Sequence, residues 1–149
     1  MQTAGRLVLV AIFAAFTQLP ALASGGLWCW ADDKDAKFQV DAGLSNGGGL
    51  FNFRGDLEVR SGGTPEAFRK LRLADDDLIQ WWIDEKELRL RIYREQQDAP
   101  HGILRLIFKT KLVDEGSYAG TYDLKLAVPK DNVETGVVDV SGQTSCGAE

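Results

Sequence analysis

Histidine and cysteine are scarce in this sequence, which contains only His101, Cys29 and Cys146 of these two types. A zinc site draws its ligands mainly from several His and Cys side chains, so the chain lacks the set that zinc needs. His101 stands in a polar loop, residues 96–102, which offers no sign of a base beside either thiol. The sequence therefore predicts no metal site, no cofactor site and no histidine-activated catalytic thiol.

Motifs of catalysis and nucleotide binding are also missing. No Gly-x-Ser-x-Gly or dinucleotide motif occurs, and no helical pattern follows the glycines at 47–49, as a phosphate loop would require. The acidic groups at 32–35 and 75–77 lack the spacing of a calcium loop and are interpreted as solvated turns. No acid stands among apolar residues that would raise the pKa of a general acid. We expect a non-catalytic protein, with a small secreted hydrolase that uses unmarked carboxylates as an alternative.

Positive charge is not in excess. The formal net charge is −5, and the chain contains no internal repeat or low-complexity segment. Nucleic acids and anionic lipid surfaces are bound through dense Lys and Arg patches, so neither is expected as the main partner.

Long hydrophobic runs are absent too, since the longest apolar run spans only residues 7–16. It is too short to cross the roughly 30 Å core of a bilayer. Arg6 precedes it, Pro20 follows it, and Ala21 and Ala23 form a small-residue cleavage site, which is the plan of a secretory signal peptide. We predict a signal peptide over 1–23, a single β domain over 24–149, a periplasmic or secreted location, and no membrane insertion after cleavage.

The two cysteines lie near the ends of the predicted mature chain. In an exported protein an isolated pair is most simply interpreted as one disulfide. We predict a Cys29–Cys146 bond that joins the first strand to the last.

Alternating apolar and polar residues recur in short segments along the chain, separated by Gly, Asp and Pro turns. This period of two is typical of strands that bury one face. Residues 65–73 fit a helix start with Thr64 as its cap, or a strand, and we expect a short helical turn near 65–70 that passes into a strand. The fold class predicted is all-β, an antiparallel β-sandwich or small closed barrel of about eight strands.

The clearest hairpin covers residues 78–93, with a charged turn at 84–87. A two-residue turn and a four-residue turn both give the same register, so the pairing of the two strands does not depend on which turn forms. This register places one face of the hairpin in the core and the other outside. The core face is predicted to contain Ile79, Trp81, Ile83, Leu88, Leu90 and Ile92, and Phe51, Phe53 and Phe108 are also assigned to the core.

The outer face of the hairpin is the candidate contact surface. It gathers an exposed Trp, a Tyr and two Arg without an acid, and these types are enriched at binding hot spots. Its residues are Gln80, Trp82, Arg89, Arg91 and Tyr93. The other interpretation of Trp82 is a surface side chain covered by the Arg89 guanidinium.

An exported β domain of this size, with Cys29 and Cys146 near its ends, is similar in plan to the small periplasmic lysozyme inhibitors. The resemblance concerns architecture alone and assigns no site residues. We expect a binding module for an envelope protein, an attacking enzyme or a saccharide; a structural or assembly component of the cell envelope is the alternative.

Overall fold

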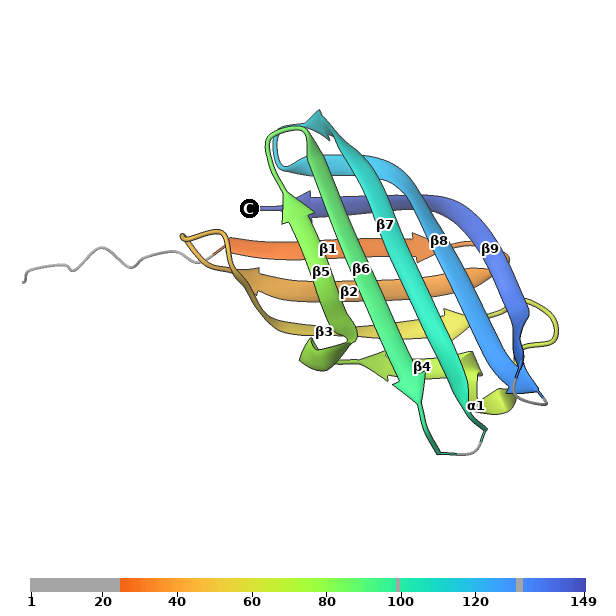
Figure 1. The fold of residues 1–149 in the computed structure, drawn as a ribbon. Coiled ribbons are helices and arrows are strands. Elements are labelled where there is room, and N and C mark those ends of the chain that lie inside the picture. Colours follow the sequence, from red (N-terminus) through yellow and green to blue (C-terminus); the bar gives the residue numbers. More distant parts are fainter. Residues whose placement is uncertain (1–24, 99, 131–132) are drawn as a thin grey trace, which may run out of the picture.

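The computed structural model describes residues 25–98, 100–130 and 133–149, which form nine antiparallel strands of one sheet (Figure 1). The predicted signal peptide, residues 1–23, lies outside the described residues. The strands are β1 (Gly25–Asp32), β2 (Ala36–Leu44), β3 (Leu50–Val59), β4 (Lys70–Leu73), β5 (Leu78–Ile83), β6 (Glu87–Gln96), β7 (Gly102–Asp114), β8 (Ser117–Lys130) and β9 (Val133–Ala148).

The sheet curls around a single core. Its strand order is β4-β3-β2-β1-β9-β8-β7-β6-β5, and β1 to β4 run across the direction of β5 to β8 in Figure 1. Within the described residues no pairing joins the terminal strands β4 and β5. The predicted antiparallel all-β fold is confirmed in the form of a curled half-barrel; the pairing does not confirm a closed barrel or a sandwich.

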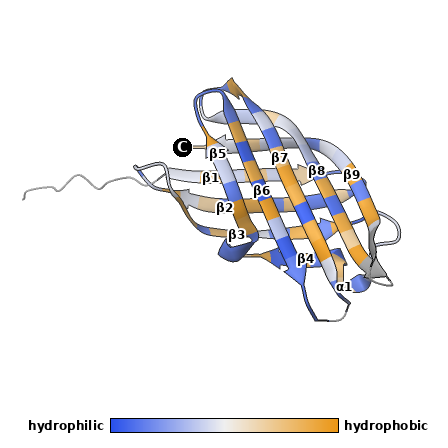
Figure 2. Cartoon of the chain, in the orientation of Figure 1, coloured by the Kyte–Doolittle hydropathy of each residue, from blue (hydrophilic) through white to orange (hydrophobic). Residues whose placement is uncertain are grey.

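Strand alternation supplies the core. Apolar and polar residues alternate along β6, β7 and β8 (Figure 2). Leu88, Leu90 and Ile92 of β6 and Leu104, Leu106 and Phe108 of β7 are buried in the core. Phe38 on β2 makes edge-to-face contacts with Phe108 on β7 and Tyr122 on β8, at centroid distances of 5.0 and 5.1 Å. These contacts join the two halves of the sheet through its interior, and such aromatic pairs stabilise beyond the area they bury.

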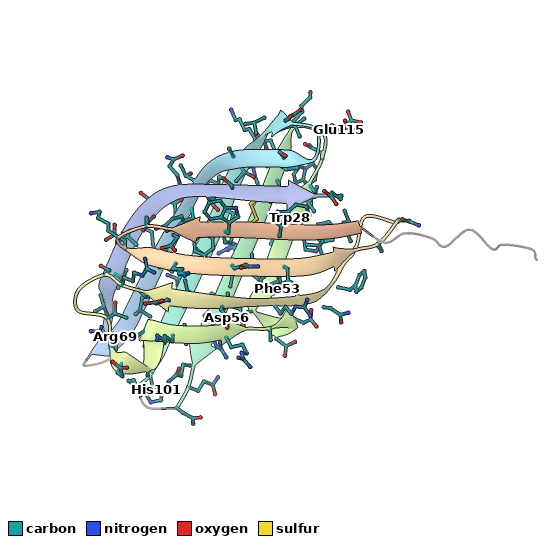
Figure 3. The ribbon with its side chains drawn as sticks, turned by 180° about the vertical axis from the view of Figure 1, so that it is seen from behind. Trp28, Phe53, Asp56, Arg69, His101 and Glu115 are labelled. Atoms are coloured by element: carbon teal, nitrogen blue, oxygen red, sulfur yellow. A yellow bond between two sulfur atoms is a disulfide. The ribbon has the colours of Figure 1, made fainter. Side chains whose placement is uncertain are left out.

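The predicted disulfide is present. Cys29 and Cys146 lie directly opposite each other in the β1–β9 pairing, with a Cα–Cα distance of 4.0 Å (Figure 3). Both cysteines are buried, whereas Trp28 and Trp30 on either side of Cys29 are exposed, as the alternation predicts. Neither cysteine is free to act as a thiol.

Residues 66–73 follow the expected order of helical turn and strand. The short helix α1 (Glu66–Arg69) leads directly into β4. The capping prediction for Thr64 is wrong, because its hydroxyl donates to the Ser61 carbonyl, at 2.7 Å, and Pro65 occupies the cap position. Phe68 is the residue of α1 that enters the core.

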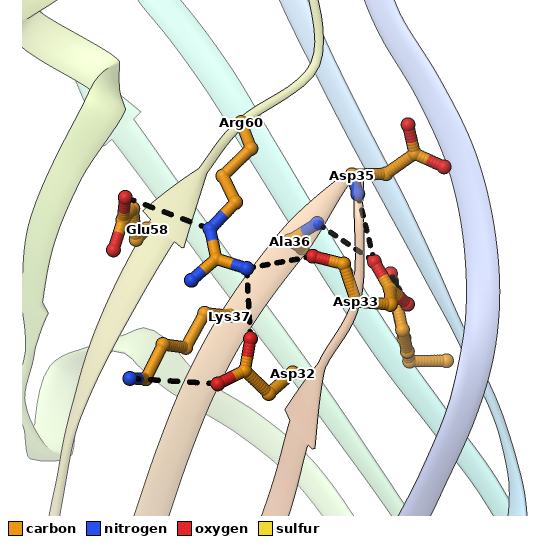
Figure 4. Close-up of polar contacts among 8 residues, drawn as sticks. Asp32, Asp33, Asp35, Ala36, Lys37, Glu58 and Arg60 are labelled. Carbon is orange, nitrogen blue, oxygen red and sulfur yellow. Dashed lines mark hydrogen bonds and ion pairs between the residues drawn. The ribbon is translucent and has the colours of Figure 1, made fainter.

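The acidic segments serve local structure. At the β1–β2 turn, Asp33 Oδ1 accepts the N–H groups of Asp35 and Ala36, and Arg60 donates to Asp32 (Figure 4). The second segment is a 3₁₀ turn, η1 (Asp75–Asp77), in which Asp77 is buried. The interpretation of both segments as entirely solvated turns is therefore wrong for Asp77, while their role as turns is confirmed.

Three core assignments are wrong, two of them on the terminal strand β5 and one on β3. Trp81 is 39% exposed, Ile79 is 50% exposed and Phe51 is 42% exposed. Strand β5 pairs only with β6, so no further strand covers Trp81. A bulge between Leu78 and Gln80 shifts the register, so that Leu78 rather than Ile79 lies opposite Ile92.

Phe51 lies outside the core for a different reason. The β2–β3 register shifts between Asp41 and Gly43, and Asn52 has a φ of 52°. These irregularities break the alternation, and the Phe51 ring lies against Gly43 instead, where a side chain would overlap it. Phe53 and Phe108, by contrast, are buried as predicted.

Candidate binding groove on β5, β6 and β7

The hairpin register brings the predicted contact residues onto one outer face. Trp82 lies opposite Arg89, and Gln80 lies opposite Arg91, as predicted. Tyr93 follows on β6, where it pairs with Arg105 of β7 and is partly buried. Trp82 is the most exposed tryptophan of the described chain, at 58%.

An open groove of about 530 Å³ lies over this face. It takes in four of the five predicted residues but not Tyr93. Its lining consists of Gln80, Trp81, Trp82, Asp84, Glu87, Arg89, Leu90, Arg91, Ile107, Phe108 and Lys109. The groove therefore combines a large aromatic surface with several hydrogen-bonding side chains, a composition typical of ligand sites.

The hairpin turn holds the Trp82 ring in place. Trp82 Nε1 donates to Asp84 Oδ2 at 3.0 Å, while Asp84 Oδ1 accepts the N–H groups of Lys86 and Glu87, each at 2.7 Å. The bonds from Lys86, Glu87 and Trp82, in that order of influence, lower the pKa of Asp84. Asp84 is thus an ionised acceptor that fixes both the turn and the indole.

The hairpin turn is anchored to the body of the sheet. Tyr118, buried on β8, donates its hydroxyl to the Asp84 carbonyl at 2.9 Å, and Leu112 N–H donates to the Lys86 carbonyl at 2.8 Å. Trp82 consequently lies on β5 beside a turn that is held in place, so binding need not order its ring first.

Acidic residues neutralise most of the groove's cations, so the prediction of an acid-free cationic face is wrong. Arg89 pairs with Glu87, Nη2–Oε2 2.6 Å, and Lys109 pairs with Asp123, Nζ–Oδ2 3.1 Å. Within the described residues Arg91 has no ion pair. Arg89 is therefore engaged along its own strand, in a pair that the sequence did not predict.

Sequence reasoning missed seven lining residues. Trp81, Leu90 and Phe108 were assigned to the core, and Asp84, Glu87, Ile107 and Lys109 were not assigned to the site. Parity along the strands was a usable signal for the two acids, because Asp84 shares the face of Trp82 and Glu87 shares that of Arg89. The β7 residues needed the β6–β7 register, in which Arg91 lies opposite Ile107 and Arg89 opposite Lys109. No short motif encodes that pairing.

A second, larger concavity of about 1020 Å³ lies on the outer face of β1 to β4. Trp30, 52% exposed, lies at its β1 side. Its charges largely neutralise one another through pairs such as Arg54–Asp41 at 2.7 Å. Unlike Trp82, Trp30 has no hydrogen bond to its indole among the described residues. This face is a weaker candidate because nothing there fixes an aromatic ring.

The remaining chemistry of the described residues is limited. No group of three or more His, Cys, Asp or Glu side chains in them is arranged to hold a metal ion. His101 is exposed, at the end of the molecule where α1 and Arg69 lie (Figure 3). None of the helices in the described ranges is long and apolar enough to cross a membrane.

Comparison of the chain with protein-family models, with curated proteins and with solved structures finds no match.

Proposed function

We propose that this protein is a non-catalytic binding module that takes a saccharide in the groove over β5, β6 and β7. The observation that carries the proposal is the Trp82 ring, 58% exposed and held by Asp84 at the edge of an open groove. A large, half-exposed aromatic ring that is already oriented offers contact area at little entropic cost.

The side chains around Trp82 suit a polyhydroxylated ligand. A sugar ring presents a flat face of C–H groups that can pack on an indole, and hydroxyls around its rim that need donors and acceptors. Gln80 supplies both an amide donor and a carbonyl acceptor, and Arg91 supplies donors that no described acid occupies. Asp84 and Glu87 add acceptor oxygens at the turn end of the groove.

The ion pairs favour a neutral saccharide over a strongly acidic partner. Glu87 and Asp123 neutralise Arg89 and Lys109, so the groove offers Arg91 as its one cation without a described ion pair. An anionic polymer is held by several uncompensated Lys or Arg side chains. Such a set is not found in the described lining.

Acid–base chemistry is not favoured by the groove. Glycoside hydrolysis uses a carboxylic acid whose pKa is raised, together with a second carboxylate. The hydrogen bonds that Asp84 accepts lower its pKa, which is the opposite direction. Glu87 is held in its pair with Arg89. Binding without cleavage is therefore the activity we propose.

We also propose that the protein works after export, in the periplasm or outside the cell. The Cys29–Cys146 bond supports this location, since disulfides persist in oxidising compartments. The leader-like pattern of residues 1–23 supports the same route. Intact-mass measurement of the exported protein should give a chain that starts at Ser24, and a retained Met1 would contradict the proposal.

Binding of neutral oligosaccharides tests the proposed function. We expect a glycan array and titration calorimetry to find a neutral ligand whose affinity falls at least about tenfold in Trp82→Ala. Trp30→Ala is the matched control, because it removes a similarly exposed tryptophan, 52% against 58%, from the other half of the sheet. Asp84→Asn should weaken binding as well, since it loosens the turn that positions the indole.

Equal affinity in wild-type protein and folded Trp82→Ala would place the site elsewhere. Binding confined to acidic glycans, with affinity that collapses as salt rises, would show that the groove recognises charge. The absence of any glycan ligand would contradict the saccharide proposal itself.

A further inference from the structure

The two terminal strands of the sheet are protected to different degrees. The terminal strand β4 carries the exposed cations Lys70 and Arg72, and Arg94 Nη1 of β6 donates to the Arg72 carbonyl at 2.6 Å. Charged side chains and covering groups of this kind are how sheets prevent unwanted strand pairing. The other terminal strand, β5, has the sequence Leu-Ile-Gln-Trp-Trp-Ile without a charge. The bulge of β5 lies at the start of the strand. Gln80 to Ile83 therefore form a regular edge that carries no charged side chain.

The register identifies which backbone groups of this edge are unpaired. Asp84 N–H donates to the Glu87 carbonyl at 3.0 Å, which makes this the first hydrogen-bonded pair of the hairpin. Hydrogen-bonded and non-hydrogen-bonded pairs alternate along an antiparallel ladder. Gln80 and Trp82 therefore direct their backbone groups toward β6, whereas Trp81 and Ile83 direct theirs away from it. Within the described residues those outward groups have no partner.

A groove lined by both apolar and polar side chains runs beside the same edge, with Asn52 and Asp75 as its polar members. It has a volume of about 410 Å³ and separates β5 from the start of β3. Phe51 and Trp81 line it, and they are 42% and 39% exposed. On the β3 side Phe53 N–H donates to Asp75 Oδ1 at 2.5 Å, so η1 already occupies that backbone. A strand added to β5 would direct alternate side chains into this groove.

Acidic residues bracket the edge. Asp75 and Asp76 precede β5 and Glu85 follows it, and all three are exposed. Asp77 is buried and paired with Arg94, and the Asp84 carboxylate is occupied by the hairpin turn. A second copy that paired with β5 in antiparallel fashion would bring the acidic start of one strand beside the acidic end of the other. Like charges in that arrangement repel. An extended segment with Lys or Arg at both ends would instead find a complementary charge at each end.

We propose that β5 is a docking edge for an extended segment of another protein, with apolar side chains at alternate positions and basic residues at its ends. The segment would pair with the backbone of Trp81 and Ile83 and place apolar side chains against Phe51 and Trp81. Backbone pairing of this kind supplies affinity, and the groove supplies selectivity. Trp81 lines both this groove and the groove proposed for saccharide, whereas Trp82 lines only the saccharide groove and Phe51 only the groove beside the edge. Variants of Trp82 therefore separate the two proposals, and either can fail alone.

A displayed library of random linear peptides, selected on the purified protein, tests the proposal. We expect selected peptides to carry basic ends around an alternating apolar stretch. Their binding should slow amide hydrogen exchange at Trp81 and Ile83. Replacing the basic ends of a selected peptide with Glu should weaken binding at least about tenfold.

Two matched variants separate the edge from the outer face. Trp81→Lys puts a charge on the β5 edge and should weaken peptide binding at least about tenfold. Trp82→Lys should leave peptide binding within about threefold, because the backbone of Trp82 is paired with β6. Denaturant unfolding confirms that both variants fold.

Three results would overturn the inference. Selection that yields no peptide is one, and peptides that leave Trp81 and Ile83 exchanging freely are another. Protection of the same amides that grows with protein concentration, without peptide, would show that a second copy occupies the edge.

Discussion

A buried tyrosine hydroxyl links β8 to the β1–β2 turn, across the two halves of the sheet. Tyr122 on β8 is 0% exposed, and its hydroxyl donates to Asp33 Oδ2 in the β1–β2 turn at 2.6 Å. Burial and the bond to Asp33 raise the pKa of Tyr122 above its ordinary value of 10.0. Burial alone would raise the pKa of Asp33, but the bonds from Tyr122, Ala36 and Asp35 hold it below its ordinary value of 3.8.

These two shifts set opposite limits on stability. The folded pKa of Tyr122 is raised, so its contribution is complete below pH 10 and is lost as the pH rises further. The folded pKa of Asp33 is lowered, so its contribution is present above pH 3.8 and is lost as the pH falls below that value. Tyr118, whose pKa burial also raises, acts in the same direction as Tyr122.

Tyr122→Phe should lower the free energy of unfolding by about 1.5–3 kcal/mol at neutral pH, the range for a hydrogen bond to a charged group. It should also flatten the loss of stability above pH 10, without abolishing it because Tyr118 remains. Denaturant unfolding across pH measures both effects. Tyr93→Phe is the control, since its hydroxyl makes only a long exposed bond, 3.3 Å, to Glu95. Equal losses in the two variants would contradict the special role of the Tyr122–Asp33 bond.

At the scale of the elements, β9 carries a glycine opposite a bulky side chain of β8. Gly142 lies opposite Tyr122, and a Cβ on it would overlap both Asp33 Oδ2 and the Tyr122 ring. Gly136 on the same strand has nothing within 4 Å of its ideal Cβ position. The strand therefore contains one glycine fixed by packing and one that packing does not require.

Gly142→Ala should destabilise the protein by about 1–3 kcal/mol, the usual cost of overpacking. Gly136→Ala should change stability by under about 1 kcal/mol, because the added methyl group meets no neighbour and alanine restricts the unfolded chain. Thermal or denaturant unfolding of the two variants makes the comparison directly. A tolerated Gly142→Ala would show that the Tyr122 ring can move without cost.

Strand alternation and turn composition were enough to predict most elements. The pairings of Trp82 with Arg89 and Gln80 with Arg91 followed from parity and from the turn at 84–87 alone. The disulfide followed from the count of cysteines. Local patterns sufficed here because a strand with one buried face carries its apolar residues at alternate positions, and these positions identify the buried face.

Irregularities and edges could not be predicted in the same way. No residue type marks the bulge that exposes Ile79, and the exposure of Phe51 depends on the backbone of Asn52. Trp81 has the parity of a core residue but lies on a terminal strand, and strand order is a property of the whole sheet. For the groove, parity located Trp82 and Arg91 on the outer face, while Lys109 required the partner strand.

At the scale of the whole molecule, the sheet consists of two groups of strands joined at one narrow place. Strands β4 to β1 form one group and β9 to β5 the other. The β1–β9 pairing between the groups spans only residues 27–30 and 145–148, whereas the β8–β9 pairing runs from Ser117 to Lys130. Cys29 and Cys146 lie within that short junction, and Thr144 Oγ1 adds a bond to the Trp30 carbonyl at 2.9 Å. The disulfide thus reinforces the short β1–β9 pairing that joins the two groups of strands.

Removal of the disulfide should therefore act on the junction first. The cysteines are separated by 117 positions, and closing a loop near that size corresponds to roughly 4–5 kcal/mol in the chain-entropy estimate. We therefore expect the double variant Cys29→Ala, Cys146→Ala to lose about 2–5 kcal/mol of the free energy of unfolding. Amide hydrogen exchange should accelerate earliest in residues 27–30 and 145–148, because few ladder bonds hold them. The β6–β7 pairing, which spans ten residue pairs from Glu87 to Gln96, serves as the internal reference and should lose protection only with global unfolding. Uniform acceleration across both regions would mean that the sheet opens as one unit and that the bond acts only on the unfolded chain.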